Sequence, residues 1–157
     1  MSHASLPRPA ELLPHRHDAV LLDVVTGAEY HRLTASLVVR PGKAFSDASG
    51  NLPGWIGPEI MAEAVAALSG YRSLNLRGRA AGIGLLLGVR GYTATAGEFH
   101  PGEQLDVEVI ESSEDEEGRA VFDGTIRREG RLVASGTLTV FQPADDSFLD
   151  RECARDD

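Results

Sequence analysis

The feature that most constrains the fold is one long apolar segment, residues 53–71, with the sequence PGWIGPEIMAEAVAALSGY. Pro58 suits the first turn of a helix, where its missing N–H removes no hydrogen bond. From there to about Leu74 the only residue that disfavours a helix is Gly70. A helix that is apolar on nearly every face has to be enclosed by the rest of the protein. We therefore predict a buried central helix that carries two glutamates, Glu59 and Glu63.

The chain on both sides of this helix has the period of two that is typical of β-strands. Residues 19–40 contain two β-rich runs, which we expect to be separated by Thr26, Gly27 and Ala28. Residues 41–54 are dense in Gly, Pro, Ser and Asp and predict a loop. Four further strands are expected after the helix, at 80–95, 103–113, 118–130 and 131–143, with turns at Pro101–Gly102, Glu117–Gly118 and Glu129–Gly130.

One helix can be covered on several sides only by a sheet that curls around it. The order of elements therefore predicts an α+β fold in which a curved antiparallel sheet wraps a long central helix. A chain of 157 residues can bury roughly 70% of its unfolded surface, which is enough for a core without disulfide staples. We expect residues 1–143 to form a single domain, with a short helix near its start that ends at Pro14, and 144–157 to form a polar acidic tail.

Charge and composition exclude several classes of function. The net charge of −9 argues against a uniformly basic surface for nucleic acid. No apolar run is long enough to cross a membrane, and the N-terminus lacks the apolar stretch of a signal peptide. Cys153 is the single cysteine, which favours a reducing compartment over a disulfide framework. We therefore expect a cytoplasmic protein that binds neither nucleic acid nor membrane.

Several short stretches, taken together, resemble one known family. LLPHRHDAVLLDVV and PGWIGPEIMAEA resemble the opening and the helix start of the hotdog-fold 3-hydroxyacyl-[acyl-carrier-protein] dehydratases. GIGLLLGVRGY, GEFHPGEQLDVEV and LVASGTLTVFQP are similar to the aryl-polyene-type branch of these thioester dehydratases. The resemblance covers about residues 10–143. No single stretch is highly specific, but five in the same order are hard to obtain by chance.

The resemblance implies a dimer with active sites at the subunit interface. The substrate would be a 3-hydroxyacyl group on the phosphopantetheine arm of an acyl carrier protein, and loss of water would give a 2-enoyl thioester. It implies neither a metal nor a redox cofactor. Such a reaction needs a base for the proton next to the carbonyl, an acid for the leaving hydroxyl, and donors for the enolate oxygen.

Glu59 aligns with the catalytic acid of the family. A helix N-terminus favours its ionised form, whereas burial against Trp55 and repulsion from Glu63 favour its neutral form. The resemblance gives Glu63 a supporting role, either toward Glu59 or toward a polar group at the subunit interface. It makes the backbone N–H groups of Gly54 and Trp55 candidates for the enolate oxygen, since glycine lets a substrate approach the backbone closely.

The base of the family is missing from its usual place. Typical members carry a histidine fourteen residues before the acid, a position that holds Phe45 here. The base could come from a homologous partner subunit, since the acid and the histidine of one site come from different chains in this fold. It could instead be another histidine, of which His15 and then His17 are nearest by family topology. The third alternative is that the chain is a non-catalytic partner subunit.

Between Glu63 and Glu98 the chain has no acid but four arginines: Arg72, Arg77, Arg79 and Arg90. We expect them to line the mouth of an acyl tunnel, where they would meet a phosphate or an acidic carrier protein. Arg90 is the favoured member because it matches the branch's LLG-x-R stretch. An acyl thioesterase remains an alternative function, because its helix has a similar sequence. The sequence leaves open whether the dimer contains one kind of subunit or two.

Overall fold

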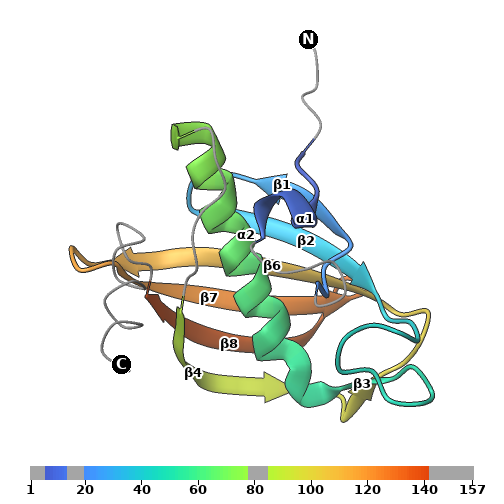
Figure 1. Cartoon of the computed structure of the whole chain (residues 1–157). Coiled ribbons are helices and arrows are strands. Elements are labelled where there is room, and N and C mark those ends of the chain that lie inside the picture. Colours follow the sequence, from blue (N-terminus) through green and yellow to red (C-terminus); the bar gives the residue numbers. More distant parts are fainter. Residues whose placement is uncertain (1–5, 14–19, 78–84, 142–157) are drawn as a thin grey trace, which may run out of the picture.

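The computed structural model describes residues 6–13, 20–77 and 85–141, which form one curved sheet around one long helix (Figure 1). The helix α2 spans Gly57–Arg77 and follows directly on a short 3-10 turn, η2, at Gly54–Ile56. The remaining elements are the short helix α1 (Pro9–Leu12) and the strands β1 (Val24–Ala28), β2 (Arg32–Val38), β3 (Leu52–Pro53), β4 (Leu85–Ala94), β5 (Glu98–Phe99), β6 (Gln104–Glu114), β7 (Arg119–Arg128) and β8 (Arg131–Phe141).

Six of the strands form a single antiparallel sheet in the order β1-β2-β6-β7-β8-β4, while β3 pairs with β5 in a separate two-stranded sheet. The large sheet curls, and α2 runs across its concave face (Figure 1). This arrangement confirms the predicted α+β fold with a wrapped central helix. Strand β4, which follows α2 in the chain, lies at one edge of the sheet and β1 at the other.

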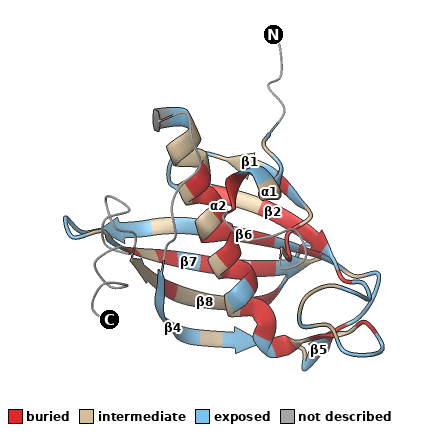
Figure 2. Ribbon diagram, in the orientation of Figure 1, coloured by how far each residue is buried: buried red, intermediate tan, exposed pale blue. Residues whose placement is uncertain are grey.

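The core lies between the concave face of the sheet and the inner face of α2 (Figure 2). Ile60, Met61 and Leu68 on the helix are completely buried, as are Leu105 and Ile126 on the sheet. The predicted alternation is confirmed in β2, where Leu33, Ala35 and Leu37 are buried, and in the first half of β6, where Leu105, Val107 and Val109 are buried. Burial of the apolar helix therefore holds the fold together.

The opposite face of α2 is less covered in this chain. Glu59 is exposed, and Ala62, Ala66 and Ser69 are half-buried at helical spacing along the same face (Figure 2). The edge strand β4 also carries apolar side chains that the chain leaves exposed, at Leu85, Leu86 and Leu87. An exposed strand edge with apolar neighbours favours pairing with another chain.

The turn predicted between the first two strands was wrong. Thr26, Gly27 and Ala28 belong to β1, and the chain reverses at residues 29–31 instead. Gly27 marks a β-bulge in the pairing of β1 with β2, and a Cβ at this position would lie 2.7 Å from Thr34 Oγ1. This glycine therefore allows two strands to approach closely and does not form a turn.

The turns predicted after the helix are confirmed. At the last of them, Glu129 and Gly130 have φ values of 52° and 77°, which is the left-handed pair that a tight hairpin between twisted strands requires. Across the described residues, no helix is long and apolar enough to cross a membrane. The predicted C-terminal tail lies outside the described residues.

Candidate active site

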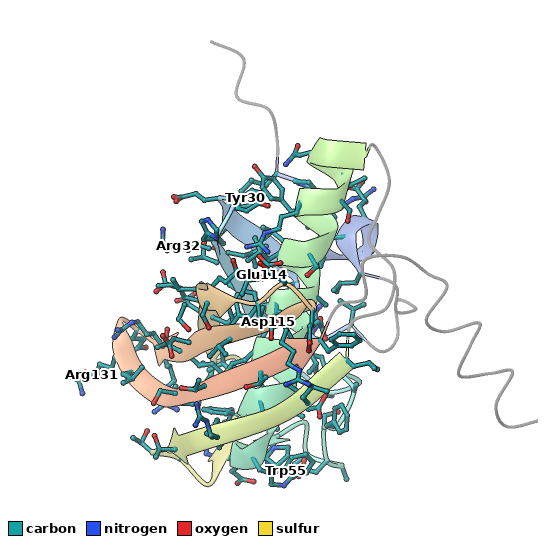
Figure 3. The ribbon with its side chains drawn as sticks, turned by 90° about the vertical axis from the view of Figure 1, so that its left-hand side faces the viewer. Tyr30, Arg32, Trp55, Glu114, Asp115 and Arg131 are labelled. Atoms are coloured by element: carbon teal, nitrogen blue, oxygen red, sulfur yellow. The ribbon has the colours of Figure 1, made fainter. Side chains whose placement is uncertain are left out.

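The candidate acid lies where α2 begins, at one end of the molecule. Glu59 is in the first turn of α2 and is exposed in the single chain. Trp55, one turn earlier in η2, is 63% exposed, and Figure 3 shows it at this end of the helix, far from Tyr30 at the other end. The sequence predicted that Trp55 would help to bury Glu59, and within one chain this is wrong, because both side chains face outward.

Glu63 has a different environment, although it is only one helical turn from Glu59. Its side chain is buried, with 7% of the residue exposed. Its carboxylate accepts hydrogen bonds from the backbone N–H groups of Leu21, at 3.1 Å, and Leu22, at 2.9 Å. Glu63 therefore anchors the segment before β1 to the middle of α2. These bonds do not support the predicted role of Glu63 in substrate binding or in assisting Glu59.

Both backbone polar groups of Gly54 form hydrogen bonds within the chain. Its N–H donates to the carbonyl of Gly97 at 2.8 Å, and its own carbonyl accepts a hydrogen bond from the Tyr92 hydroxyl at 2.6 Å. The prediction that the Gly54 N–H stabilises the enolate oxygen is therefore contradicted, because this donor is already occupied. Trp55 remains a candidate, since the first N–H groups of a helical turn have no partner inside the helix.

Phe45 occupies the position of the missing base and has an unusual conformation. Its φ of 68° places it in the left-handed region, which is rare for a bulky residue. The residue is 54% exposed, and its ring lies edge-on to the ring of Trp55, with the centroids 6.2 Å apart. Phe45 of the loop and Trp55 of η2 thus form an aromatic pair at the end of the molecule where α2 begins, and the loop has no titratable base at position 45.

The histidines within the described ranges, His31 and His100, have partners of their own. His31 contacts Glu111 at 2.9 Å, close to Tyr30, which lies at the opposite end of α2 from Trp55 (Figure 3). His100 contacts the side chain of Asn51 at 3.1 Å. The other candidates, His15 and His17, lie outside the described residues. Both histidines of the described part of the chain therefore bind groups other than the candidate acid.

Arg90 does not share the space around the candidate acid. In the pairing of β4 with β8, Arg90 is opposite Thr137, whereas its neighbour Val89 is opposite Leu138 in the core. Successive side chains of a strand point to opposite faces, so Arg90 lies on the convex face, where the Thr137 hydroxyl contacts Asp123 at 3.3 Å. Within a single chain Arg90 therefore lies away from Glu59, and its predicted place at the mouth of an acyl tunnel stays a prediction.

Arg72, the other arginine of this stretch whose side chain the structure describes, does not lie near Glu59 either. Arg72 is largely buried and binds the Glu111 carboxylate at 3.1 Å, and its guanidinium lies 4.6 Å from the centre of the Tyr30 ring. It therefore stabilises the end of α2 that is remote from Glu59. The Arg77 side chain and Arg79 lie outside what the structure describes.

An open pocket of about 570 Å³ lies elsewhere, between α1 and the chain after β2. Its charged lining includes Arg8, Glu11 and Asp23, together with Lys43, whose ammonium group binds the Asp23 carboxylate at 2.7 Å. Glu59 and Trp55 are not among the lining residues. The chain alone therefore places its candidate acid at an open surface and not inside this pocket.

The described residues near the start of α2 supply a candidate acid but no candidate base. They include an exposed carboxylate at a helix N-terminus, a neighbouring backbone donor and an aromatic pair, and their loop has no histidine at the base position. A second polypeptide that covers the outer face of α2 and the β4 edge would enclose these groups.

Solved structures with this arrangement have the hotdog fold, which defines the class of protein. A chain of the dehydratase heterocomplex ApeI:P from Xenorhabdus doucetiae matches with a TM-score of 0.85 and 26% identity, over 94% of this chain and 98% of that chain. A mutant of the phenylacetic acid degradation protein PaaI from Thermus thermophilus matches with a TM-score of 0.56 and 21% identity, over 75% and 90% of the two chains. A hypothetical thioesterase with coenzyme A from Streptococcus pneumoniae TIGR4 gives 0.57 and 16%, over 75% and 83%.

The family follows from the sequence match. The ApeP-like family model, described as ApeP dehydratase, matches residues 7–150. The chain therefore belongs to the ApeP-like dehydratases, and both the predicted fold and the predicted dehydratase family are confirmed. No match was found among curated proteins.

Tyr92 is the residue of this site that the sequence analysis missed. Its hydroxyl reaches the turn before Glu59 from strand β4. The signal was available, because the LLG-x-R-x-Y stretch contains Tyr92 as well as Arg90. Arg90 was favoured because it matches the LLG-x-R stretch. Strict alternation would place Tyr92 on the same face as Arg90, but the register shift between Arg90 and Thr93, beside Gly91 with a φ of 62°, turns Tyr92 inward.

Proposed function

We propose that this chain supplies the acid of a 3-hydroxyacyl-[acyl-carrier-protein] dehydratase, and that a homologous hotdog subunit supplies the base. The observation that carries the proposal is the exposed Glu59 at the start of α2, in a chain whose base position holds Phe45. The substrate would be carried on phosphopantetheine in a pathway of the fatty-acid or aryl-polyene type.

The proposed reaction moves two protons and breaks two bonds, the C–H bond next to the thioester carbonyl and the carbon–oxygen bond of the 3-hydroxyl group. The partner's base removes the proton on the carbon next to the thioester carbonyl, and the negative charge moves onto the carbonyl oxygen. The Trp55 N–H and the helix N-terminus stabilise this charge. As the carbon–oxygen bond of the 3-hydroxyl group breaks, Glu59 donates a proton to the leaving oxygen, so that water and a 2-enoyl thioester form. Electrons are redistributed only within the substrate, so the scheme includes neither a metal nor a redox cofactor.

The partner subunit would pair with the edge strand β4 and cover the outer face of α2. Leu85, Leu86 and Leu87 are exposed along this edge, and a strand edge offers unpaired backbone groups to another chain. Small side chains such as Ala62 and Ala66 on α2 permit close approach. The similar chain from Xenorhabdus doucetiae belongs to a dehydratase heterocomplex, which supports a partner of a different sequence.

A pair of this kind would contain one working site. Two homologous subunits related by a twofold axis create two equivalent sites, and each needs the acid of one chain and the loop of the other. The site that contains Glu59 receives its base from the partner. The second site would receive its base from this chain, whose loop presents Phe45.

The test uses a 3-hydroxyacyl carrier protein and intact mass spectrometry of the thioester. The chain would be assayed alone and with candidate hotdog subunits that carry the histidine. We expect the carrier to lose the mass of one water molecule only in the mixture, and Glu59→Gln in this chain to abolish the loss. Glu117→Gln, at an exposed glutamate of the β6–β7 hairpin, is the matched control and is expected to leave the reaction intact.

Other outcomes would assign the chain differently. Release of the whole acyl group would indicate a thioesterase. An unchanged carrier in every mixture would indicate a non-catalytic subunit. Water loss by the chain alone, without a partner, would place the base within this sequence, and a His15→Ala or His17→Ala variant would then identify it.

A further inference from the structure

Tyr92 connects the edge strand β4 to the turn that precedes the candidate acid. Its hydroxyl donates a hydrogen bond to the Gly54 carbonyl at 2.6 Å and packs against Gly57, where a Cβ would lie 2.1 Å from the Tyr92 oxygen. These two residues are the first of η2 and the first of α2. One side chain from the sheet therefore joins both ends of the turn from which α2, and with it Glu59, begins.

The packing around the turn leaves no room for a side chain at either of its glycines, Gly54 and Gly57. A Cβ at Gly57 would lie 2.1 Å from the Tyr92 oxygen and 2.6 Å from two carbons of its ring. A Cβ at Gly54 would lie 2.2 Å from the Ala96 carbonyl oxygen. The Gly54 N–H is also bound to the Gly97 carbonyl at 2.8 Å. The turn is thus held on one side by Tyr92 and on the other by residues 96–97.

The acid itself has no such constraint. Glu59 is exposed, and an exposed glutamate gains its direction only from the backbone that carries it. Trp55 is in the same position, because it lies in η2 and is 63% exposed. A change in the backbone conformation of the turn would therefore displace both Glu59, the proposed proton donor, and the Trp55 N–H, the proposed donor to the enolate oxygen.

We propose that Tyr92 is a positioning residue of the dehydratase site, which fixes the 54–57 turn and through it the placement of Trp55 and Glu59. This inference rests on the proposed function. Tyr92 touches neither substrate nor reacting atoms in this scheme. Burial raises the pKa of the Tyr92 hydroxyl, so the group keeps its proton at neutral pH and can donate to the Gly54 carbonyl.

The test is Tyr92→Phe, which keeps the ring and removes only the hydroxyl. In the complete pair of subunits, we expect kcat to fall by about 10- to 100-fold, since small displacements of catalytic groups have effects of this size. The KM is expected to stay unchanged, because the surface that binds the carrier is not altered. The matched control is Tyr71→Phe, at a half-buried tyrosine on α2 itself, which is expected to leave kcat unchanged.

Hydrogen exchange gives a readout that does not depend on activity. The Gly57 amide is expected to exchange faster in Tyr92→Phe than in the wild type, and at the wild-type rate in Tyr71→Phe. Gly57→Ala would disturb the same contact, because its Cβ would lie 2.1 Å from the Tyr92 oxygen. This variant is expected to lower kcat as well. Thermal unfolding of each variant shows whether it is folded at the assay temperature.

The outcomes separate the two proposals. A folded Tyr92→Phe pair with wild-type kcat would overturn the positioning role, and so would an unchanged exchange rate at Gly57. Faster exchange at Gly57 together with a lower kcat at constant KM would support it. If the wild-type pair never removes water from the carrier, the proposed function is overturned, and the exchange rate still decides whether Tyr92 holds the turn.

Discussion

Replacing Glu63 with alanine tests the claim that the two glutamates of α2 have opposite roles. The variant removes the acceptor for the Leu21 and Leu22 N–H groups, which are bound at 3.1 and 2.9 Å. Each buried donor that loses its partner costs about 1–3 kcal/mol. We therefore expect Glu63→Ala to lower the free energy of unfolding by about 2–5 kcal/mol.

The assay is thermal and urea unfolding followed by circular dichroism at neutral pH. For a chain of this length, the expected loss corresponds to a Tm lower by about 4–20 °C. Glu63→Gln keeps one acceptor oxygen and turns an amide group toward a second donor, so its Tm should lie between those of wild type and Glu63→Ala. Glu59→Gln changes an exposed side chain and is expected to leave Tm within about 2 °C of wild type.

The refuting result is a Glu63→Ala protein with the Tm of the wild type. Equal Tm losses in Glu63→Ala and Glu59→Gln would also contradict the assignment, because they would show that burial does not distinguish the two side chains. A third contradiction would be a stable Glu63→Ala chain that has lost activity in the mixture. That result would place Glu63 in the chemistry after all.

Three further predictions concern other parts of the fold. Phe45→Gly is expected to leave stability almost unchanged, since relief of the left-handed strain of about 1 kcal/mol offsets the lost ring contact of about 1 kcal/mol; a large change in urea unfolding would contradict this. Backbone hydrogen bonds, first that from Asn51, hold the pKa of Asp47 below its ordinary value. The ionised Asp47 therefore stabilises the folded loop above the pKa that this carboxyl has in the unfolded chain, and this stabilisation is lost as the pH falls through the lower pKa of the folded state. An NMR titration giving Asp47 an ordinary or raised pKa would refute that. Gly70→Ala would bring a Cβ within 2.2 Å of the Leu12 carbonyl oxygen, so we expect a lower Tm despite a gain in helix propensity of about 1 kcal/mol; a higher Tm would show that α1 moves away without cost.

The sequence was most informative where a pattern depends on burial. The apolar segment around Met61 predicted a wrapped helix, and the alternation of Leu105, Val107 and Val109 predicted a half-buried strand. Both signals arise from the same cause, since apolar side chains are selected by the face on which they lie. The family resemblance extended this to a hotdog fold.

Bulges explain part of what the sequence did not show. The strict alternation predicted for the last strand fails at its start, where Leu132 is exposed and both Val133 and Ala134 are buried. The pairing of β7 with β8 shifts register between Ile126 and Arg127. Such a shift arises from the pairing of two strands, so the pattern of apolar and polar residues in one strand does not predict it.

The site was harder to predict because its contacts join distant segments. The Gly54 N–H was a reasonable donor by its place in the chain, but the carbonyl of Gly97 occupies it. Glu63 could not be separated from Glu59 without knowing that residues 21–22 cross the helix beside it. Both facts depend on long-range contacts that a local motif does not encode.

Phe45→His offers a complementary test of the missing base. The change would place an imidazole at the position where the family has its histidine, so the variant alone is expected to remove water from the carrier-bound substrate as a self-paired dimer. The double variant Phe45→His with Glu59→Gln is expected to be inactive. A self-paired Phe45→His protein, shown as a dimer by native mass spectrometry, that leaves the substrate unchanged would contradict the shared site.

The central claim is that the carboxylate of Glu59 in this chain donates the proton in a site completed by another subunit. The most direct measurement is the single-turnover rate of water loss by the purified pair of subunits that carries Glu59→Gln in this chain only. We expect this rate to fall by at least about 100-fold, the effect typical of a general acid, while the pair still assembles. An intact pair that reacts at the wild-type rate would contradict the claim.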